Sequence, residues 1–146
     1  MKIYLAGPFF NDQERQIIEK VRDILRSGGH EVFVPMEHFI PDGETLPNAV
    51  WGKKVFDMDV EAINNCDIVY AVYHGHYSDS GTAWEIGYAY AKSIPVVLLH
   101  TDQKNISSVM PVNSAVSNIF LDGEDISGTM LRESIYGNCS ELVEQK

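Results

Sequence analysis

The sequence predicts an α/β fold, in which an open parallel sheet of about five strands carries helices on both faces in the flavodoxin-like or Rossmann-like manner. Strand-like apolar runs alternate with segments of helical periodicity along most of the chain, a pattern typical of parallel strands joined by crossover helices. The length of 146 residues fits one domain, expected to span residues 1–146. Hydrophobic residues make up 45% of the chain and charged residues 22%, a globular balance that argues against extended disorder.

The first strand and helix are expected close to the N-terminus. Residues 3–6 are apolar and typical of a short strand. Asn11, followed three residues later by Glu14, has the spacing of a capping box and marks the start of a helix. The glycine pair 28–29 ends this helix, because glycine readily adopts the left-handed conformation. Its core face is predicted from apolar residues at helical spacing: Ile17, Ile18, Val21, Ile24 and Leu25.

The next elements repeat the strand and helix pattern. Residues 31–34 are predicted as a second strand, and residues 35–47 as a polar loop rich in turn-forming residues. Apolar residues at helical spacing predict a second helix over residues 50–63, which the asparagine pair 64–65 ends. Residues 67–72 then form a continuous apolar run typical of a buried strand.

The C-terminal half continues this alternation. Asp79 opens a third helix that is expected to run through Ala91. Residues 95–99 are predicted as the fourth strand, and a short fifth strand is expected near residues 118–121. Residues 129–143 are predicted as a last, less regular helix.

The charge balance and the apolar runs exclude two classes of partner. The formal net charge of -10, with no basic cluster, disfavours binding to nucleic acid and to anionic membrane surfaces. The longest apolar stretches, such as residues 94–99, are far shorter than the roughly 20 residues of a membrane span. The N-terminus runs straight into a strand-like segment without the pattern of a signal peptide, so we expect a cytoplasmic protein.

Neither the cysteines nor the histidines indicate a metal site. Cys66 and Cys139 have no metal-ligand or redox spacing, so reduced thiols are expected. His74 and His76 form the only close histidine pair, and no carboxylate cluster of ligand spacing accompanies them. No glycine-rich phosphate cradle is present either, and the function is expected to need no metal and no cofactor.

In a sheet of this kind the ligand crevice lies at the carboxyl ends of the strands. This rule selects the loops after the first and third strands, residues 7–10 and 74–79. Glu85 lies in the opening turns of the helix after the second loop, where the helix dipole favours its ionised form. An acidic residue in the first turns of a helix is in most cases a surface residue that matches the dipole, and the position of Glu85 alone does not overturn that interpretation.

Three segments favour a functional reading of this region. Residues 4–10, 57–67 and 79–89 resemble, in the same order, the three signature blocks of the nucleoside 2-deoxyribosyltransferase family. The likeness extends from residue 3 to about residue 120, and the three blocks together are far more specific than any one of them. The resemblance implies a base-exchange enzyme that acts on 2'-deoxynucleosides and free nucleobases.

The resemblance also implies roles for individual residues. Glu85 matches the nucleophile, and Tyr4 matches the tyrosine that positions it. Asp59 matches the aspartate at the base, and Asp79 matches the aspartate that contacts the deoxyribose. Gly7 lies in the first block, beside the expected sugar site.

These roles agree with the chemistry of base displacement. The transition state at C1' resembles an oxocarbenium ion, which a carboxylate such as Glu85 can stabilise and then trap as an ester. A carboxyl group such as Asp59 can supply a proton to the departing base. Each residue also has a plainer interpretation: Asp59 as a solvated helix residue, Asp79 as a helix N-cap, and Tyr4 as a core aromatic.

Two further residues complete the expected substrate site. Of the aromatic residues that could stack on the base, namely Phe9, Phe10 and Trp51, Phe10 is favoured. Asn113 partly matches a family motif whose asparagine reaches a neighbouring subunit's sugar site, which implies a homo-oligomer with shared active sites. Ser114 and Ala115 depart from the leucine and methionine that often follow this asparagine in the family, and the polar residues 140–146 depart from its aromatic tail.

Two other functions remain open at this stage. A 2'-deoxynucleoside 5'-monophosphate N-glycosidase would share the fold and the glutamate but would need serine or arginine in the first loop, where residues 7–11 have neither. Ser78 and Ser80 keep this hydrolase in consideration. A non-catalytic nucleotide-sensing module would bind a ligand without releasing base. The sequence does not distinguish purine from pyrimidine, since the loop at residues 35–47 has no clear match.

Overall fold

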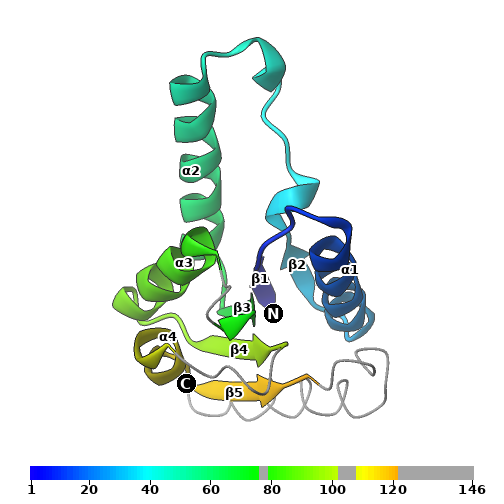
Figure 1. Cartoon of the computed structure of the whole chain (residues 1–146), viewed down its shortest axis with the longest axis vertical. Coiled ribbons are helices and arrows are strands. Elements are labelled where there is room, and N and C mark those ends of the chain that lie inside the picture. The colour runs from blue at the N-terminus through cyan, green and yellow to red at the C-terminus, as the bar shows by residue number, and fades with distance from the viewer. Residues whose placement is uncertain (76–78, 102–107, 122–146) are drawn as a thin grey trace.

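The computed structural model describes residues 1–75, 79–101 and 108–121. It shows the predicted α/β fold, with five parallel strands in the order β2-β1-β3-β4-β5, which is the flavodoxin-like order (Figure 1). The strands are β1 (Lys2–Ala6), β2 (Glu31–Phe33), β3 (Ile68–Tyr73), β4 (Val96–His100) and β5 (Ser117–Phe120).

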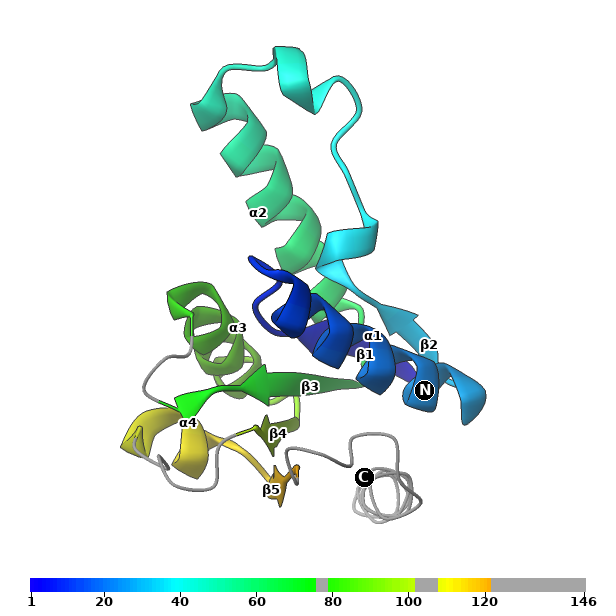
Figure 2. The same ribbon diagram turned by 45° about the vertical axis from the view of Figure 1, so that its right-hand side comes forward.

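Helices cover both faces of this sheet, as the alternating pattern predicts. α1 (Asp12–Ser27) packs on one face, and α2 (Asn48–Asn64), α3 (Ser80–Ala91) and α4 (Val109–Ser114) lie on the other (Figures 1 and 2). Side chains from alternate strand positions form the two core layers. The layer under α1 includes Leu5, Val21, Leu25, Val72 and Leu99. The layer under α2 and α3 includes Tyr4, Ile63, Val69, Ile86 and Leu98.

The capping box predicted for α1 forms with one difference. The Asn11 side chain accepts a hydrogen bond from the Glu14 backbone N–H at 2.9 Å, as expected of an N-cap. The Glu14 carboxylate, however, accepts from the Phe10 N–H at 2.8 Å instead of from the Asn11 N–H. The Glu14 side chain therefore fixes the loop between β1 and α1 at Phe10, one residue before the N-cap. Gly29 takes the left-handed conformation, with φ of 84°, after the end of the helix.

Gly7 joins β1 to this loop where there is no space for a side chain. A Cβ atom there would lie 2.5 Å from Ile18 Cδ1 and 3.1 Å from Val72 Cβ. The loop therefore passes directly over the core between α1 and β3.

We expect Gly7→Ala to lower the free energy of unfolding by about 1–3 kcal/mol, because the new methyl group overpacks this contact. Gly52→Ala is the matched control, since a Cβ at Gly52 in α2 meets nothing within 4 Å and alanine favours the helix. Urea denaturation of both variants measures the difference. An equal effect at the two positions would show that the close packing around Gly7 carries no stability.

The structure differs from the sequence prediction mainly at α4. No helix was predicted over Val109–Ser114, because six residues are too few for a helical periodicity and the segment contains Pro111. Within the predicted loop over residues 35–47, the structure has two short 3-10 turns, η1 (Pro35–Glu37) and η2 (Gly43–Thr45). The helix predicted over residues 129–143 lies outside the described residues.

Among the helices that the structure describes, none is long and apolar enough to cross a membrane. α2 is the longest of the described helices and projects from the sheet in the same direction as the connection that leaves β2 (Figures 1 and 2).

Candidate active site

Tyr4 and Glu85 meet at the face of the sheet that α2 and α3 cover. Tyr4 is fully buried in β1, and its hydroxyl donates a hydrogen bond to Glu85 Oε1 at 2.7 Å. Glu85 comes from the second turn of α3, 81 residues further along the chain. The contact implied by the family resemblance, a tyrosine beside the glutamate, is present in the geometry.

The environment of Glu85 raises its pKa to about 7. Burial of the carboxyl group is the largest cause, and the nearby Asp59 and Asp79 carboxylates raise the pKa further. The hydrogen bond from Tyr4 opposes this shift by stabilising the ionised form. The sequence-based expectation that the helix dipole favours ionisation is thus outweighed by burial, and Glu85 titrates near neutral pH.

Asp59 lies on α2 and belongs to the same electrostatic cluster. Burial raises its pKa to about 6, and its charge contributes to the raised pKa values of Glu85 and Tyr4. Oδ1 of Asp59 is buried and has no hydrogen-bond partner among the described residues. A buried carboxyl oxygen without a partner is costly, so this atom is suited to bind a donor or to carry a proton itself.

The predicted cap at Asp79 is confirmed. Its carboxylate accepts hydrogen bonds from the Gly81 N–H at 2.7 Å and from the Thr82 N–H at 3.0 Å, and the Thr82 hydroxyl donates to it at 2.8 Å. These bonds fix the first turn of α3, the helix that carries Glu85. Asp79 remains partly exposed, so capping leaves part of the carboxylate open to a ligand.

The two aromatic residues after β1 lie outside the core. Phe10 is 72% exposed and stacks on Phe9, with 5.9 Å between the ring centroids. The backbone of this loop is held by Glu14, which binds the Phe10 N–H, and by Arg15, whose Nε donates to the Phe9 carbonyl at 3.0 Å. The loop thus presents the exposed ring of Phe10, stacked on the half-buried Phe9, on a fixed backbone.

Asn113 is not brought to Glu85 within one chain. It is exposed on α4, and its side-chain amide donates to the Val109 carbonyl at 2.7 Å. It lines a pocket of about 490 Å³ between α3 and α4, and the α3 residues that line this pocket are Ala83, Ile86, Gly87 and Tyr90. Glu85 does not line this pocket.

Two residues that the sequence analysis did not select extend the site. The ring of Tyr4 stacks on Phe33, with 5.6 Å between centroids and 13° between planes. Phe33 in turn stacks on His38 at 4.1 Å and 3°. The available signal was the alternation in β2, where Phe33 stands between two core residues that face α1 and therefore points to the opposite face.

A family model described as nucleoside 2-deoxyribosyltransferase matches residues 3–142 of the chain. The chain belongs to the nucleoside 2-deoxyribosyltransferase family. The model covers all three of the resembling segments and most of the chain. The family assignment predicted from the sequence is confirmed, and with it the assignment as an enzyme.

Individual members of this family and related structures agree with the assignment. A nucleoside deoxyribosyltransferase of Limosilactobacillus fermentum is 29% identical over 116 residues, which are 73% of this chain and 69% of the relative. The solved structure of a 2-deoxyribosyltransferase from Bacillus psychrosaccharolyticus superimposes with a TM-score of 0.76 and 34% identity, covering 90% of this chain and 96% of the other.

A CMP N-glycosidase of Clostridium botulinum has the same fold at lower identity. Its TM-score is 0.65 with 22% identity, and the likeness covers 93% of this chain and 99% of the other. At this level of identity the likeness concerns the fold alone, since one fold hosts many activities.

Proposed function

We propose that this nucleoside 2-deoxyribosyltransferase exchanges the base of 2'-deoxynucleosides by a retaining double displacement through a deoxyribosyl ester on Glu85. The hydrogen bond from the Tyr4 hydroxyl to Glu85 Oε1 carries this proposal. It orients the carboxylate and leaves Oε2 for the sugar. A carboxylate in this setting can attack the anomeric carbon of a nucleoside.

In the first displacement, Glu85 Oε2 forms a bond to C1' as the bond from C1' to the base nitrogen breaks. The departing base takes a proton from Asp59, whose pKa of about 6 lets it carry a proton at a higher pH than an ordinary aspartate. In the second displacement a free base attacks C1', the ester bond breaks, and the proton of the incoming base returns to Asp59. Asp79 and the loop at Gly7 hold the deoxyribose, and Phe10 stacks on the base.

The two carboxyl groups need different protonation states at the same pH. Glu85 must be ionised to attack, and Asp59 must be protonated to release the base. With pKa values of about 7 for Glu85 and about 6 for Asp59, the free pair keeps its last proton mainly on Glu85. The form that reacts, with Glu85 ionised and Asp59 protonated, is therefore the less populated one in the free protein. The Tyr4 hydrogen bond raises its population by stabilising the ionised Glu85 carboxylate. No metal or cofactor takes part in this scheme.

We further propose that active sites are completed between two copies of the chain in a homo-oligomer. Asn113 contacts its own helix and lies on the pocket side of α3, so within one chain it does not contact the Tyr4 and Glu85 pair. The surface around it is apolar, with Tyr90, Val109 and Met110 exposed. Exposed apolar surface of this kind is typical of an interface with another subunit.

The hydrolase is the second candidate function, and the structure adds one observation to it. Arg15 of α1 donates a hydrogen bond to the Phe9 carbonyl in the loop after β1, although residues 7–11 of that loop include no arginine themselves. Asp12 and Glu14 in the first turn of α1 stand beside it and disfavour a bound phosphate. The balance of charge at this loop therefore favours an uncharged nucleoside.

Incubation of the protein with 2'-deoxyinosine and free thymine tests the proposal. We expect thymidine to form with the β configuration, because two successive inversions at C1' give net retention. Inosine should react far more slowly, since its 2'-hydroxyl withdraws electrons from the oxocarbenium-like centre. Chromatography and NMR identify the product and its anomer.

The other outcomes of this assay are distinct. Release of hypoxanthine without thymidine, together with faster release from 2'-deoxyinosine 5'-monophosphate, would favour the hydrolase. Binding without base release would favour the sensing module. A product of α configuration would contradict the double displacement.

A further inference from the structure

Aromatic rings form a column that runs from the proposed nucleophile to the surface. Tyr4 binds Glu85 through its hydroxyl, Phe33 stacks on Tyr4, and the exposed ring of His38 stacks on Phe33. The strand register fixes the inner part of the column, because Tyr4 of β1 pairs directly with Phe33 of β2. His38 therefore stands on the same face of the sheet as Glu85.

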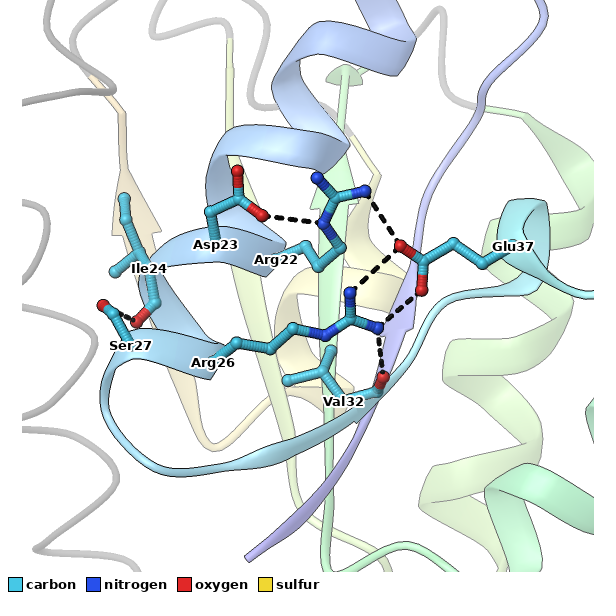
Figure 3. A network of polar contacts seen from close by, with 7 residues as sticks. All are labelled: Arg22, Asp23, Ile24, Arg26, Ser27, Val32 and Glu37. Carbon is cyan, nitrogen blue, oxygen red and sulfur yellow. Dashed lines mark hydrogen bonds and ion pairs between the residues drawn. The ribbon is translucent and has the colours of Figure 1, made fainter.

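An ion-pair cluster holds the turn that carries His38. Glu37, the last residue of η1, lies between two arginines of α1 (Figure 3). Its carboxylate binds Arg22 Nη1 at 2.8 Å and Arg26 Nη2 at 2.5 Å, and the same Arg26 nitrogen donates to the Val32 carbonyl at 3.0 Å. The hydrogen bonds from Arg26 and Arg22 lower the pKa of Glu37, so the cluster stays ionised at neutral pH.

Stacking and the ion pairs thus fix the His38 ring while leaving its nitrogens open. Among the described residues, the Phe33 stack is the only contact recorded for this ring, and neither nitrogen has a hydrogen-bond partner. Asp59 Oδ1, on α2, is another polar atom on this face that has no hydrogen-bond partner in the described part of the chain. α2 and the connection that carries His38 extend from the sheet in the same direction and join at their far ends (Figures 1 and 2).

A nucleobase carries along its edge hydrogen-bonding groups of the kinds that these two side chains can pair with. Its ring nitrogens need a group that accepts or gives a proton, which Asp59 provides. Its exocyclic carbonyl oxygens need a donor. Imidazole carries at least one N–H in either protonation state, so His38 is a donor throughout the working pH range.

We propose that His38 is a specificity-determining residue that donates a hydrogen bond to an exocyclic carbonyl oxygen of the bound base. The inference rests on the proposed function, since it assigns the base edge of the same site. It predicts a preference for bases that carry a carbonyl group, such as 6-oxopurines, over those that lack one. The fixed ring makes the preference strong, because a donor held in place loses little entropy when it binds.

The test uses His38→Phe, which keeps a flat ring on Phe33 but removes the donor, and His38→Gln, which keeps an N–H donor without the ring. The two nucleoside substrates are 2'-deoxyinosine, whose base carries the exocyclic oxygen, and 2'-deoxynebularine, whose base lacks it. We expect His38→Phe to reduce the kcat/KM ratio of 2'-deoxyinosine to 2'-deoxynebularine about tenfold, chiefly through KM, and His38→Gln to retain most of the ratio. His30→Phe, at the other end of β2, is the matched control and should leave the ratio unchanged.

An unchanged ratio in His38→Phe would overturn the inference, and so would an equal loss of kcat on both donors, since that would indicate a purely structural role. If the wild-type protein released base from neither nucleoside, the proposed function itself would fail. Isothermal titration of free hypoxanthine against free purine gives the same comparison without turnover. There too, we expect His38→Phe to lose affinity for hypoxanthine and to keep its affinity for purine. Hypoxanthine binding by His38→Phe as strong as that of the wild type would contradict the inference.

Discussion

Glu85→Ala and Glu85→Gln should each lose base exchange by several orders of magnitude while remaining folded. Removing a covalent nucleophile removes the reaction path, and losses of roughly 10⁴-fold or more are typical of such changes. Glutamine keeps the shape of the side chain and an oxygen that can accept the Tyr4 hydrogen bond. A loss of activity in Glu85→Gln would therefore be due to the missing nucleophile. Initial rates of thymidine formation from 2'-deoxyinosine measure the effect.

Trapping the covalent intermediate tests the role of Glu85 directly. Mass spectrometry of the wild-type protein with a 2'-deoxynucleoside should show a deoxyribosyl adduct on the peptide that contains Glu85. Thr82→Ser is a suitable control variant, because it alters the same helix and keeps the hydroxyl that binds Asp79. Turnover by Glu85→Ala at a rate close to the wild type would refute the assignment.

The raised pKa of Glu85 also has a consequence for stability. The pKa is about 7 in the folded protein against 4.5 for the ordinary side chain, so the folded state holds its proton more tightly. Ionisation therefore destabilises the folded protein as the pH rises through this window, and the destabilisation is complete above about pH 7. Glu85→Gln removes it and should be more stable than the wild type at pH 8 by on the order of 1–2 kcal/mol, after allowance for partial exposure.

This stability difference should vanish at low pH. Below the ordinary pKa of 4.5 the wild-type carboxyl is neutral in both states, so the two proteins should have similar free energies of unfolding there. Urea denaturation at pH 4 and pH 8 tests both ends of the window. A Glu85→Gln variant less stable than the wild type at pH 8 would contradict the view that burial dominates at this site.

The fold could be predicted from the sequence because its signals are local. The strand and helix periods, the Asn11 cap and the Asp79 cap each depend on a few neighbouring residues, and the structure places elements within one or two residues of the predicted bounds. α4 could not be predicted, because six residues around Pro111 carry no helical period and fold against α3 through tertiary packing.

The site was predicted only in part, because some of its interactions join residues that are far apart in the sequence. The resemblance selected Tyr4, Asp59 and Glu85, and the structure brings these three together although they come from three separate elements. The stack of Tyr4 on Phe33 depends on the register between β1 and β2, which no local pattern reveals. The pKa of Glu85 depends on burial, which the helix dipole argument leaves out.

The proposed sharing of active sites predicts recovery of activity from two inactive proteins. Asn113→Ala should be nearly inactive if this amide completes a neighbour's sugar site. The change should leave the fold intact, because Asn113 is exposed and its recorded bond is to its own helix. Ser114→Ala is the matched control on α4, with a hydroxyl that bonds the Pro111 carbonyl, and it should remain active.

Mixing equal amounts of Glu85→Ala and Asn113→Ala should then restore activity as subunits exchange. In a two-fold symmetric pair, half of the randomly formed pairs are hybrids, and each hybrid has one site with both residues intact. About a quarter of the wild-type activity is therefore expected after complete exchange. Activity is measured as thymidine formation over time after mixing, with the separate variants as references.

The course of recovery decides what the result means. If subunits exchange slowly, activity should rise over the exchange time, and brief unfolding and refolding of the mixture should bring it to the same plateau. A mixture that stays inactive although mass measurements show hybrid oligomers would refute the shared site and leave the role of Glu85 untouched. A wild-type protein that is fully active as a monomer would do the same, because within a single chain Asn113 bonds its own helix and lines a pocket that Glu85 does not line.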